Sequence, residues 1–180
     1  EHKGDAGVRR LTTKSQFVAL LYGQLSGASS LREIETAMHS HAARLYHVGA
    51  CDVQRSTLAD ANASRPHAIF SGLFAKMVLI GSRGLRQATA DAVRLIDSTG
   101  VRLSGIASDW ARFSKAASGA KAHIIYDPDA QMPLYLEVTP AKVNDIVAAR
   151  NMPVEAGATY VFDLGYYNFA WWAELDAQGC

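Results

Sequence analysis

Apolar residues in the first part of the chain recur at the three-to-four-residue spacing of amphipathic helices. Two patterns of the form Ser/Thr-x-x-Glu/Gln, at residues 13–16 and 30–33, each precede such a run, and this pattern is typical of helix N-termini. We expect the first helix to end at Gly27 and the second near Gly49. The second helix has one apolar stripe, formed by Leu31, Ile34, Met38, Ala42 and Leu45.

Two further helices are expected before a change in composition. Ser56 is the expected cap of a helix over residues 57–62 that stops before Pro66, because the residue preceding proline disfavours helical geometry. A fourth helix covers about residues 69–80, and the stretch 81–87, made largely of Gly, Ser and Arg, is interpreted as a linker. The pattern therefore predicts a helical lobe over residues 1–86 and a second domain over residues 87–180.

The periodicity changes after this linker. Residues 92–96 form a short, mostly apolar run that ends in Asp97 and predicts a buried central strand. Residues 122–126 and 132–138 are typical of two strands, and Pro128 with its flanking aspartates supplies the turn between them. We therefore expect a strand followed by a hairpin.

The end of the chain predicts a helix, a strand and a second helix. Asn144 and Asn168 are the expected helix caps, and the apolar residues 159–162 predict a strand that ends at Asp163. The order strand, hairpin, helix, strand, helix resembles that of a ribonuclease H-like domain, in which the first and last strands lie side by side in parallel. The expected fold class is α plus α/β, with a helical lobe followed by an incomplete ribonuclease H-like mixed sheet.

Asp97 and Asp163 are the candidate catalytic and metal-binding residues. Parallel strands that end in aspartates bring both side chains to the same edge of the sheet. Magnesium prefers oxygen ligands, and two magnesium ions held there could support phosphodiester cleavage. An aspartate after a strand is also common as a turn residue or a cap, so position alone leaves both interpretations open.

Charge is unevenly distributed, although the net charge is only +1. Residues 1–90 hold 11 Lys and Arg against 6 Asp and Glu, whereas residues 91–180 hold 7 against 11. A basic front half suits a polyanion and an acidic second half suits divalent cations, but a surplus of this size also occurs on surfaces without such a role.

Composition excludes several other classes of protein. With 49% hydrophobic and 19% charged residues the chain is typical of globular proteins. Cys51 and Cys180 form no C-x-x-C pattern, so neither a disulfide framework nor a thiolate metal site is indicated. No apolar run approaches the roughly 20 residues that a membrane-spanning helix needs, so we expect a protein without membrane contact.

Several separated motifs resemble one known family. Residues 95–99, Leu-Ile-Asp-Ser-Thr, are similar to a first catalytic motif, and residues 160–166 match a second that runs aspartate, any residue, glycine, aromatic. Further similar stretches are residues 10–17, 30–35, 56–62, 119–123 and 138–145. By their order and spacing these motifs resemble the insertion-sequence DDE transposases of the group numbered four.

The resemblance implies DNA transposition. The intact enzyme would use two Mg²⁺ ions, with Mn²⁺ as an alternative, to nick double-stranded DNA at the element ends and join a 3′ hydroxyl to target DNA. It implies a homodimer on DNA, in the bacterial cytoplasm with the nucleoid, and no organic cofactor. The helical lobe would bind DNA, and its candidate contacts, with one from the second domain, are Arg10, Arg55, Asn62, Arg65 and Lys121.

One departure from the family affects the expected activity. The third acidic residue of the family lies in a Y-x-x-R-x-x-x-E-x-x-x-x-x-x-K motif that has no match in this sequence, and Glu174 on a predicted helix is not a substitute. We therefore expect a fragment of a longer reading frame that lacks the catalytic glutamate region and is inactive by itself. The alternative is a DNA-binding remnant that recognises terminal inverted repeats without any chemistry.

Other candidates favour structural roles. His39, His41 and His47 lack the spacing of a helical zinc site, and residues 81–84 lack the spacing of a phosphate loop. We expect His123 to serve packing. The tryptophans Trp110, Trp171 and Trp172 are expected to fill the core.

Overall fold

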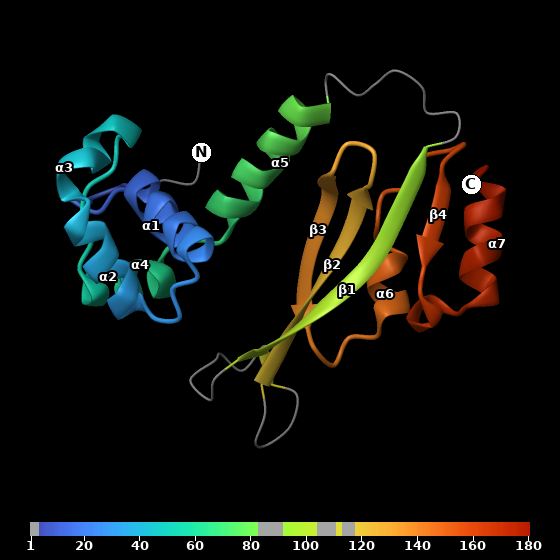
Figure 1. Ribbon diagram of the computed structural model, residues 1–180. Coiled ribbons are helices and arrows are strands. Elements are labelled where there is room, and N and C mark those ends of the chain that lie inside the picture. Colours follow the sequence, from blue (N-terminus) through green and yellow to red (C-terminus); the bar gives the residue numbers. More distant parts are fainter. Residues whose placement is uncertain (1–3, 83–91, 104–110, 113–117) are drawn as a thin grey trace. The chain divides into compact units, whose positions relative to one another are not determined.

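The computed structural model describes residues 4–82, 92–103, 111–112 and 118–180 (Figure 1). The chain forms two compact units, Glu1–Ala75 and Lys76–Cys180, and each is described by itself. The predicted linker falls largely outside the described residues. In the parts of the chain that are described, no helix has the length and apolar character needed to cross a membrane.

The first unit consists of short helices joined by tight turns (Figure 1). Its elements are α1 (Thr13–Ser26), α2 (Leu31–Ser40), α3 (Ala42–Leu45), the 3-10 turn η1 (Tyr46–Val48) and α4 (Arg55–Ser64). Helix α5 (Ala68–Ser82) begins in this unit and continues into the second. The predicted helical character of this region is confirmed.

The start of α1 differs by one residue from the predicted capping box. Thr12, rather than Thr13, is the N-cap, and its side-chain oxygen accepts a hydrogen bond from the Ser15 N–H. Gln16 therefore does not complete a box, and its buried side chain donates to Asn62 instead. Gly27 ends the helix as predicted, in the left-handed region at φ 70°.

The N-cap of α2 is Ser30, as predicted, but Glu33 bonds to the residue before the cap, and the helix ends earlier than predicted. Ser30 caps the helix by accepting from the Glu33 N–H, and the Glu33 carboxylate accepts from both the N–H and the hydroxyl of Ser29. The helix expected to run to Gly49 is interrupted at His41, which has φ −107° and ψ 12°. Because α3 resumes at the next residue, Leu45 still reaches the core, whereas Ala42 of the predicted stripe is exposed.

Helix α4 begins two residues earlier than predicted. It starts at Arg55 after Gln54, whose side chain makes no capping hydrogen bond, so Ser56 is not the cap that was predicted. Its end before Pro66 is as predicted, because Arg65 adopts an extended conformation.

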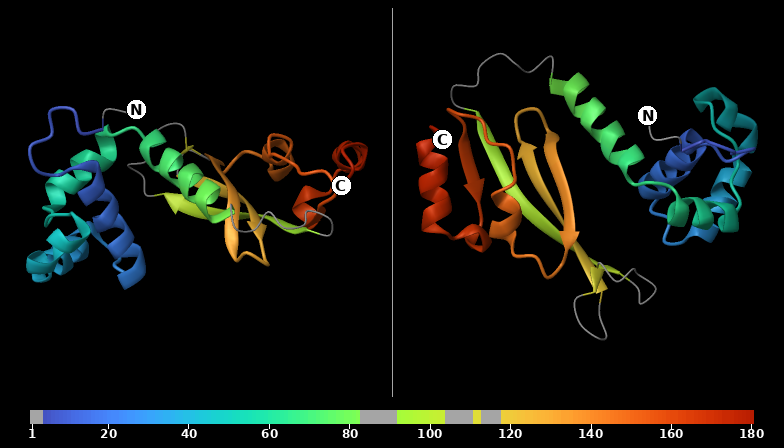
Figure 2. Two further views of the ribbon diagram at one scale, coloured as in Figure 1. Left: turned by 90° about the horizontal axis from the view of Figure 1, so that it is seen from above. Right: turned by 180° about the vertical axis from the view of Figure 1, so that it is seen from behind.

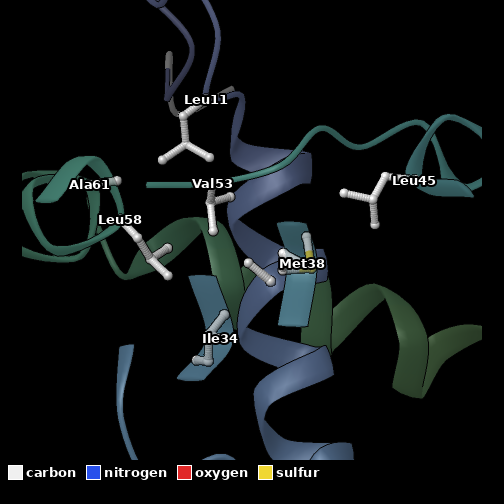
Figure 3. Packing of buried hydrophobic residues seen from close by; sticks show 8 residues of the cluster. Leu11, Ile34, Met38, Leu45, Val53, Leu58 and Ala61 are labelled. Atoms are coloured by element: carbon white, nitrogen blue, oxygen red, sulfur yellow. The ribbon is translucent and has the colours of Figure 1, made fainter. Parts of the chain in front are cut away.

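The helical unit has one apolar core, shown in Figure 3. Helices α1, α2 and α4 all contribute to it, and Met38 and Leu58 are fully buried. The cluster comprises Leu11, Ala19, Ile34, Met38, Leu45, Val53, Leu58 and Ala61. Burial of a side chain such as Leu58 stabilises the fold by roughly 1.5–3 kcal/mol relative to its exposed state.

The second unit is built on a four-stranded mixed sheet in the order β3-β2-β1-β4 (Figure 1). Its strands are β1 (Val93–Leu103), β2 (Ser118–Asp127), β3 (Met132–Pro140) and β4 (Thr159–Phe162). Strand β1 is antiparallel to β2 and parallel to β4, and β2 is antiparallel to β3. The predicted hairpin and parallel pair are confirmed, and the arrangement is consistent with a ribonuclease H-like α+β domain.

Strand β1 is longer than predicted. The expected strand ends at Asp97, but β1 continues to Leu103 because this second half pairs with residues 118–124 of β2. Its parallel pairing with β4 stops earlier, at Ile96 opposite Phe162. Asp97 therefore lies within β1, at the point where its neighbour β4 ends.

Short helices α6 (Asp145–Ala149) and α7 (Phe169–Ala177) and the 3-10 turn η3 (Leu164–Tyr166) complete this unit, which Figure 2 shows from two further sides. Asn144 caps α6 and Asn168 caps α7, as predicted. The core contains Ile96, Ile125, Ala149, Met152, Tyr166, Trp171 and Leu175. Trp171 fills this core as expected, with its ring centroid 5.0 Å from that of Phe162, whereas Trp110 lies outside the described residues.

A buried arginine joins three segments near the start of β1. Arg94 donates to Asp127 at the end of β2 over 2.9 Å and to Glu155, before β4, over 3.0 Å. The side chains of Arg94 and Asp127 are only 11% and 10% exposed, so this ion pair is largely shielded from water.

Candidate active site

The sheet register brings Asp97 and Asp163 to adjacent strands. The last parallel pair is Ile96 with Phe162, and the two aspartates are the next residue on each chain segment. Both side chains are exposed. The parallel arrangement inferred from the sequence thus places the two carboxylates at one edge of the β1–β4 pair.

Each aspartate uses one oxygen to bind its own backbone. Oδ1 of Asp97 accepts from the Ser98 N–H at 2.7 Å, and Oδ1 of Asp163 accepts from the Gly165 N–H at 2.9 Å. Asp163 thereby caps η3, so the structural role left open by the sequence is present. Within the described part of the chain, the second oxygen of each carboxylate makes no hydrogen bond, and it is available to a ligand.

A third carboxylate, Asp145, lies beside this pair and was not among the candidates from the sequence, where it was only part of the stretch 138–145. Its Oδ1 accepts from Ser98 Oγ and from Lys121 Nζ, each at 3.0 Å. The carboxylates of Asp145 and Asp163 both lie against Gly165. A methyl group added at this glycine would stand 2.9 Å from Asp163 Oδ1 and 3.5 Å from Asp145 Oδ2. The resemblance of residues 138–145 to a family block was the signal that could have identified it.

The buried phenol of Tyr166 lies near Asp97, Asp145 and Asp163. Burial is the main cause that raises the pKa of Tyr166 to about 12, and the negative charges of Asp145, Asp97 and Asp163 raise it further, while Ser98 opposes them. All three carboxylates therefore lie close enough to act on one phenol. Tyr166 stays neutral at physiological pH and adds no further negative charge.

His123 occupies the buried side of this group. Its side chain is fully buried, with Nε2 at 2.8 Å from Thr139 Oγ1 and Nδ1 at 3.7 Å from Asp145 Oδ1. Burial lowers the pKa of His123, and the nearby Asp145 only partly opposes this. A neutral, buried imidazole agrees with the packing role that we expect from the sequence.

Some of the candidate DNA contacts in the helical unit are hydrogen-bonded within the unit, whereas others are exposed to solvent. Arg65 donates to Gln16 Oε1 at 2.7 Å and to the Leu11 carbonyl, and its side chain is only 9% exposed. Asn62 accepts from Gln16 over 2.7 Å. These two side chains are therefore used within the unit.

The remaining candidates are more accessible. Arg10 pairs with Asp52 at 2.6 Å but is 71% exposed, and Arg55 is exposed at the first turn of α4. Lys121 pairs with Asp145 and is 25% exposed. Among the described residues, no group of three or more His, Cys, Asp or Glu is arranged to hold a metal ion.

Two family models match the chain. Residues 1–51 match a domain of unknown function (DUF4372), and residues 88–180 match the transposase DDE domain. The "Putative transposase y4zB" of Sinorhizobium fredii (strain NBRC 101917 / NGR234) is 41% identical over 118 residues, which cover 66% of this chain and 33% of that protein. The match thus spans about a third of the length of that relative, and no solved structure matches. Because the model of this domain matches more than half of the residues of the chain, the chain belongs to the transposase DDE domain family.

Proposed function

We propose that the chain forms part of a metal-dependent transposase whose Asp97 and Asp163 bind Mg²⁺. The observation that carries this proposal is the parallel β1–β4 pair, which ends immediately before both aspartates. Membership of the transposase DDE domain family supports it, because the aspartates stand in the motifs that resemble the first two catalytic motifs of the group numbered four.

The donor groups fit a hard divalent cation. Magnesium prefers oxygen ligands and retains several waters, which suits two exposed carboxylates whose second oxygens have no hydrogen bond to any residue that the structure describes. Two bound ions, Mg²⁺ or Mn²⁺, would activate the attacking oxygen and stabilise the leaving oxygen of a phosphodiester. The family's third ligand, a glutamate, has no match in this sequence, so we propose that the activity requires a longer protein.

The contribution of this chain is to hold the two carboxylates in place. Asp97 is fixed by the pairing of β1 with β2, and Asp163 by its cap on η3. In the intact protein we propose that these residues take part in nicking the element ends and in joining the freed 3′ hydroxyl to target DNA.

The helical lobe, residues 1–86, is proposed to bind double-stranded DNA, with the intact protein acting as a homodimer. A shallow groove of about 390 Å³ beside the starts of α2 and α4 is lined by Ser30, Leu31, Arg32, Arg55 and Ala59. Two exposed guanidinium groups at such a groove suit contacts to backbone phosphates. Among the sequence candidates in this lobe, Arg55 fits this role better than the internally bonded Arg65.

A second candidate function is that of a DNA-binding remnant without chemistry, which recognises terminal inverted repeats. It is favoured by one observation, namely that within the described residues no three metal-ligating side chains are arranged around one site. The two candidates differ in whether this chain contributes to metal binding and cleavage.

A cleavage assay separates them. The longer protein and residues 1–180 are each incubated with Mg²⁺ and DNA that carries the cognate ends. We expect the longer protein to nick this DNA, and Asp97→Ala and Asp163→Ala to abolish nicking while Asp176→Ala, a matched change on the exposed face of α7, does not. Nicking that persists in Asp97→Ala would refute the metal-site assignment, and robust cutting by residues 1–180 would show that the third acid is dispensable.

A further inference from the structure

Asp145 is the most heavily bonded carboxylate beside the candidate site. It lies in the first turn of α6, where Asn144 caps the helix. Its Oδ1 accepts hydrogen bonds from the hydroxyl of Ser98 and from the ammonium of Lys121, each at 3.0 Å. The side chain is only 20% exposed, so these bonds are partly protected from solvent.

The two oxygens of Asp145 lie toward the two segments that carry the candidate metal ligands. Ser98, which binds Oδ1, directly follows Asp97 and also donates its N–H to that residue. Oδ2 lies near Gly165, whose N–H holds Asp163. Asp145 therefore stands between β1 and the turn after β4, beyond the last β1–β4 pair at Ile96 and Phe162.

The positive charge of Lys121 reduces the repulsion between Asp145 and the two candidate ligands Asp97 and Asp163. Three negative charges close together repel one another, and the repulsion grows as water is excluded. The Lys121 ammonium, which also donates to the Val143 carbonyl at 3.2 Å, offsets the charge of Asp145. This ion pair joins β2 to α6, and Lys121 pairs in it with Asp145 rather than with Asp97 or Asp163.

We propose that Asp145 is a positioning residue that fixes the separation of Asp97 and Asp163, through Ser98 on one side and the Gly165 turn on the other. The inference rests on the proposed function, since the separation matters only if the two aspartates bind metal together. Outer-shell groups of this kind orient metal ligands, and their loss typically lowers metal affinity by about 10- to 100-fold.

The test measures the Mn²⁺ dissociation constant of the 180-residue chain from the electron paramagnetic resonance signal of free Mn²⁺. The variants are Asp145→Ala, Asp145→Asn, Asp97→Asn and, as a matched control on α7, Asp176→Ala. We expect Asp145→Ala to raise the dissociation constant by about tenfold. Asp145→Asn keeps an acceptor oxygen for Ser98, so we expect a smaller increase, and Asp176→Ala should change nothing.

Denaturant unfolding of each variant accompanies these titrations, because a purely structural role would lower stability without changing the affinity of the folded protein. Unchanged affinity in Asp145→Asn and in folded Asp145→Ala, with weaker binding in Asp97→Asn, overturns this inference alone. Equal losses in Asp145→Asn and Asp97→Asn also overturn it, because Asp145 would then be a ligand. Unchanged affinity in Asp97→Asn overturns the proposed function and this inference with it.

Discussion

The helical unit and the sheet unit use polar side chains in opposite ways. In the helical unit, Gln16 bonds to both Asn62 and Arg65, so these groups hold α1 against the end of α4. In the sheet unit, the Lys121–Asp145 pair lies beside two exposed aspartates, each of which uses one carboxylate oxygen for a backbone N–H of its own segment. The difference teaches that the partner of a polar residue, rather than its type, decides whether it serves the fold or a site.

The largest expected effect concerns the two cores. Trp171→Ala removes a side chain that is 2% exposed, and we expect it to destabilise the sheet unit by about 3–5 kcal/mol. All three tryptophans lie in residues 76–180, so tryptophan fluorescence reports on this unit alone. We expect the fluorescence transition to move to lower denaturant.

Leu58→Ala is the matched change in the helical unit. Leu58 is fully buried, and its truncation should destabilise that unit by about 2–5 kcal/mol. The loss should appear in far-ultraviolet circular dichroism, while the fluorescence transition stays where it is. A common shift of both signals in either variant would show that the two units unfold together.

Arg65→Ala examines the internal use of polar groups in the helical unit. We expect a loss of about 2 kcal/mol in unfolding free energy, because the change leaves Gln16 and the Leu11 carbonyl without their buried donor. Denaturant unfolding followed by circular dichroism measures it. Unchanged stability together with weaker DNA binding would instead make Arg65 a DNA contact.

Arg55→Ala is the opposite case. The side chain is exposed, so stability should change by less than about 0.5 kcal/mol. If Arg55 contacts a phosphate, the log-log dependence of DNA affinity on salt should become shallower by about 0.9. Binding titrations at several salt concentrations measure this slope, and an unchanged slope would remove Arg55 from the proposed interface.

The smallest effect concerns the start of α2. Two hydrogen bonds from Ser29 lower the pKa of Glu33 below its ordinary value of 4.5. The bond from the Ser29 backbone N–H has the larger effect and the bond from its hydroxyl the smaller. A lowered folded-state pKa stabilises the fold above pH 4.5, and this contribution is lost as the pH falls through the folded-state pKa. A carboxyl titration by nuclear magnetic resonance should give a midpoint below 4.5, and Glu33→Gln should remove the corresponding pH dependence of stability. A midpoint at or above 4.5 would contradict the capping role.

Local patterns were sufficient to predict most elements of the fold. The caps Ser30, Asn144 and Asn168 lie where their spacing indicates, because a cap depends on residues within one turn. The interruption at His41 has no glycine or proline to signal it. The extension of β1 past Asp97 could not be predicted either, because it depends on pairing with residues 118–124 of β2.

From the sequence, only those residues of the candidate site that lie within a single local motif could be singled out. Asp97 and Asp163 stand out because each follows an apolar strand. Asp145 does not, since its proposed role depends on Ser98, 47 positions away, and on Lys121, 24 positions away. The internal role of Arg65 was hidden for the same reason, because Gln16 is 49 positions distant.

The ion pair of Arg94 with Glu155 bears on the strand alignment at the opposite end of the sheet. Side chains alternate between the two faces of a strand, so a slip of β4 by one residue would turn Asp163 away from Asp97. Strand β4 has only four residues, and few backbone hydrogen bonds specify its alignment. Because Arg94 pairs with Glu155 shortly before β4, it links β1 to the segment that enters β4, and this ion pair favours the strand alignment that brings Asp163 next to Asp97.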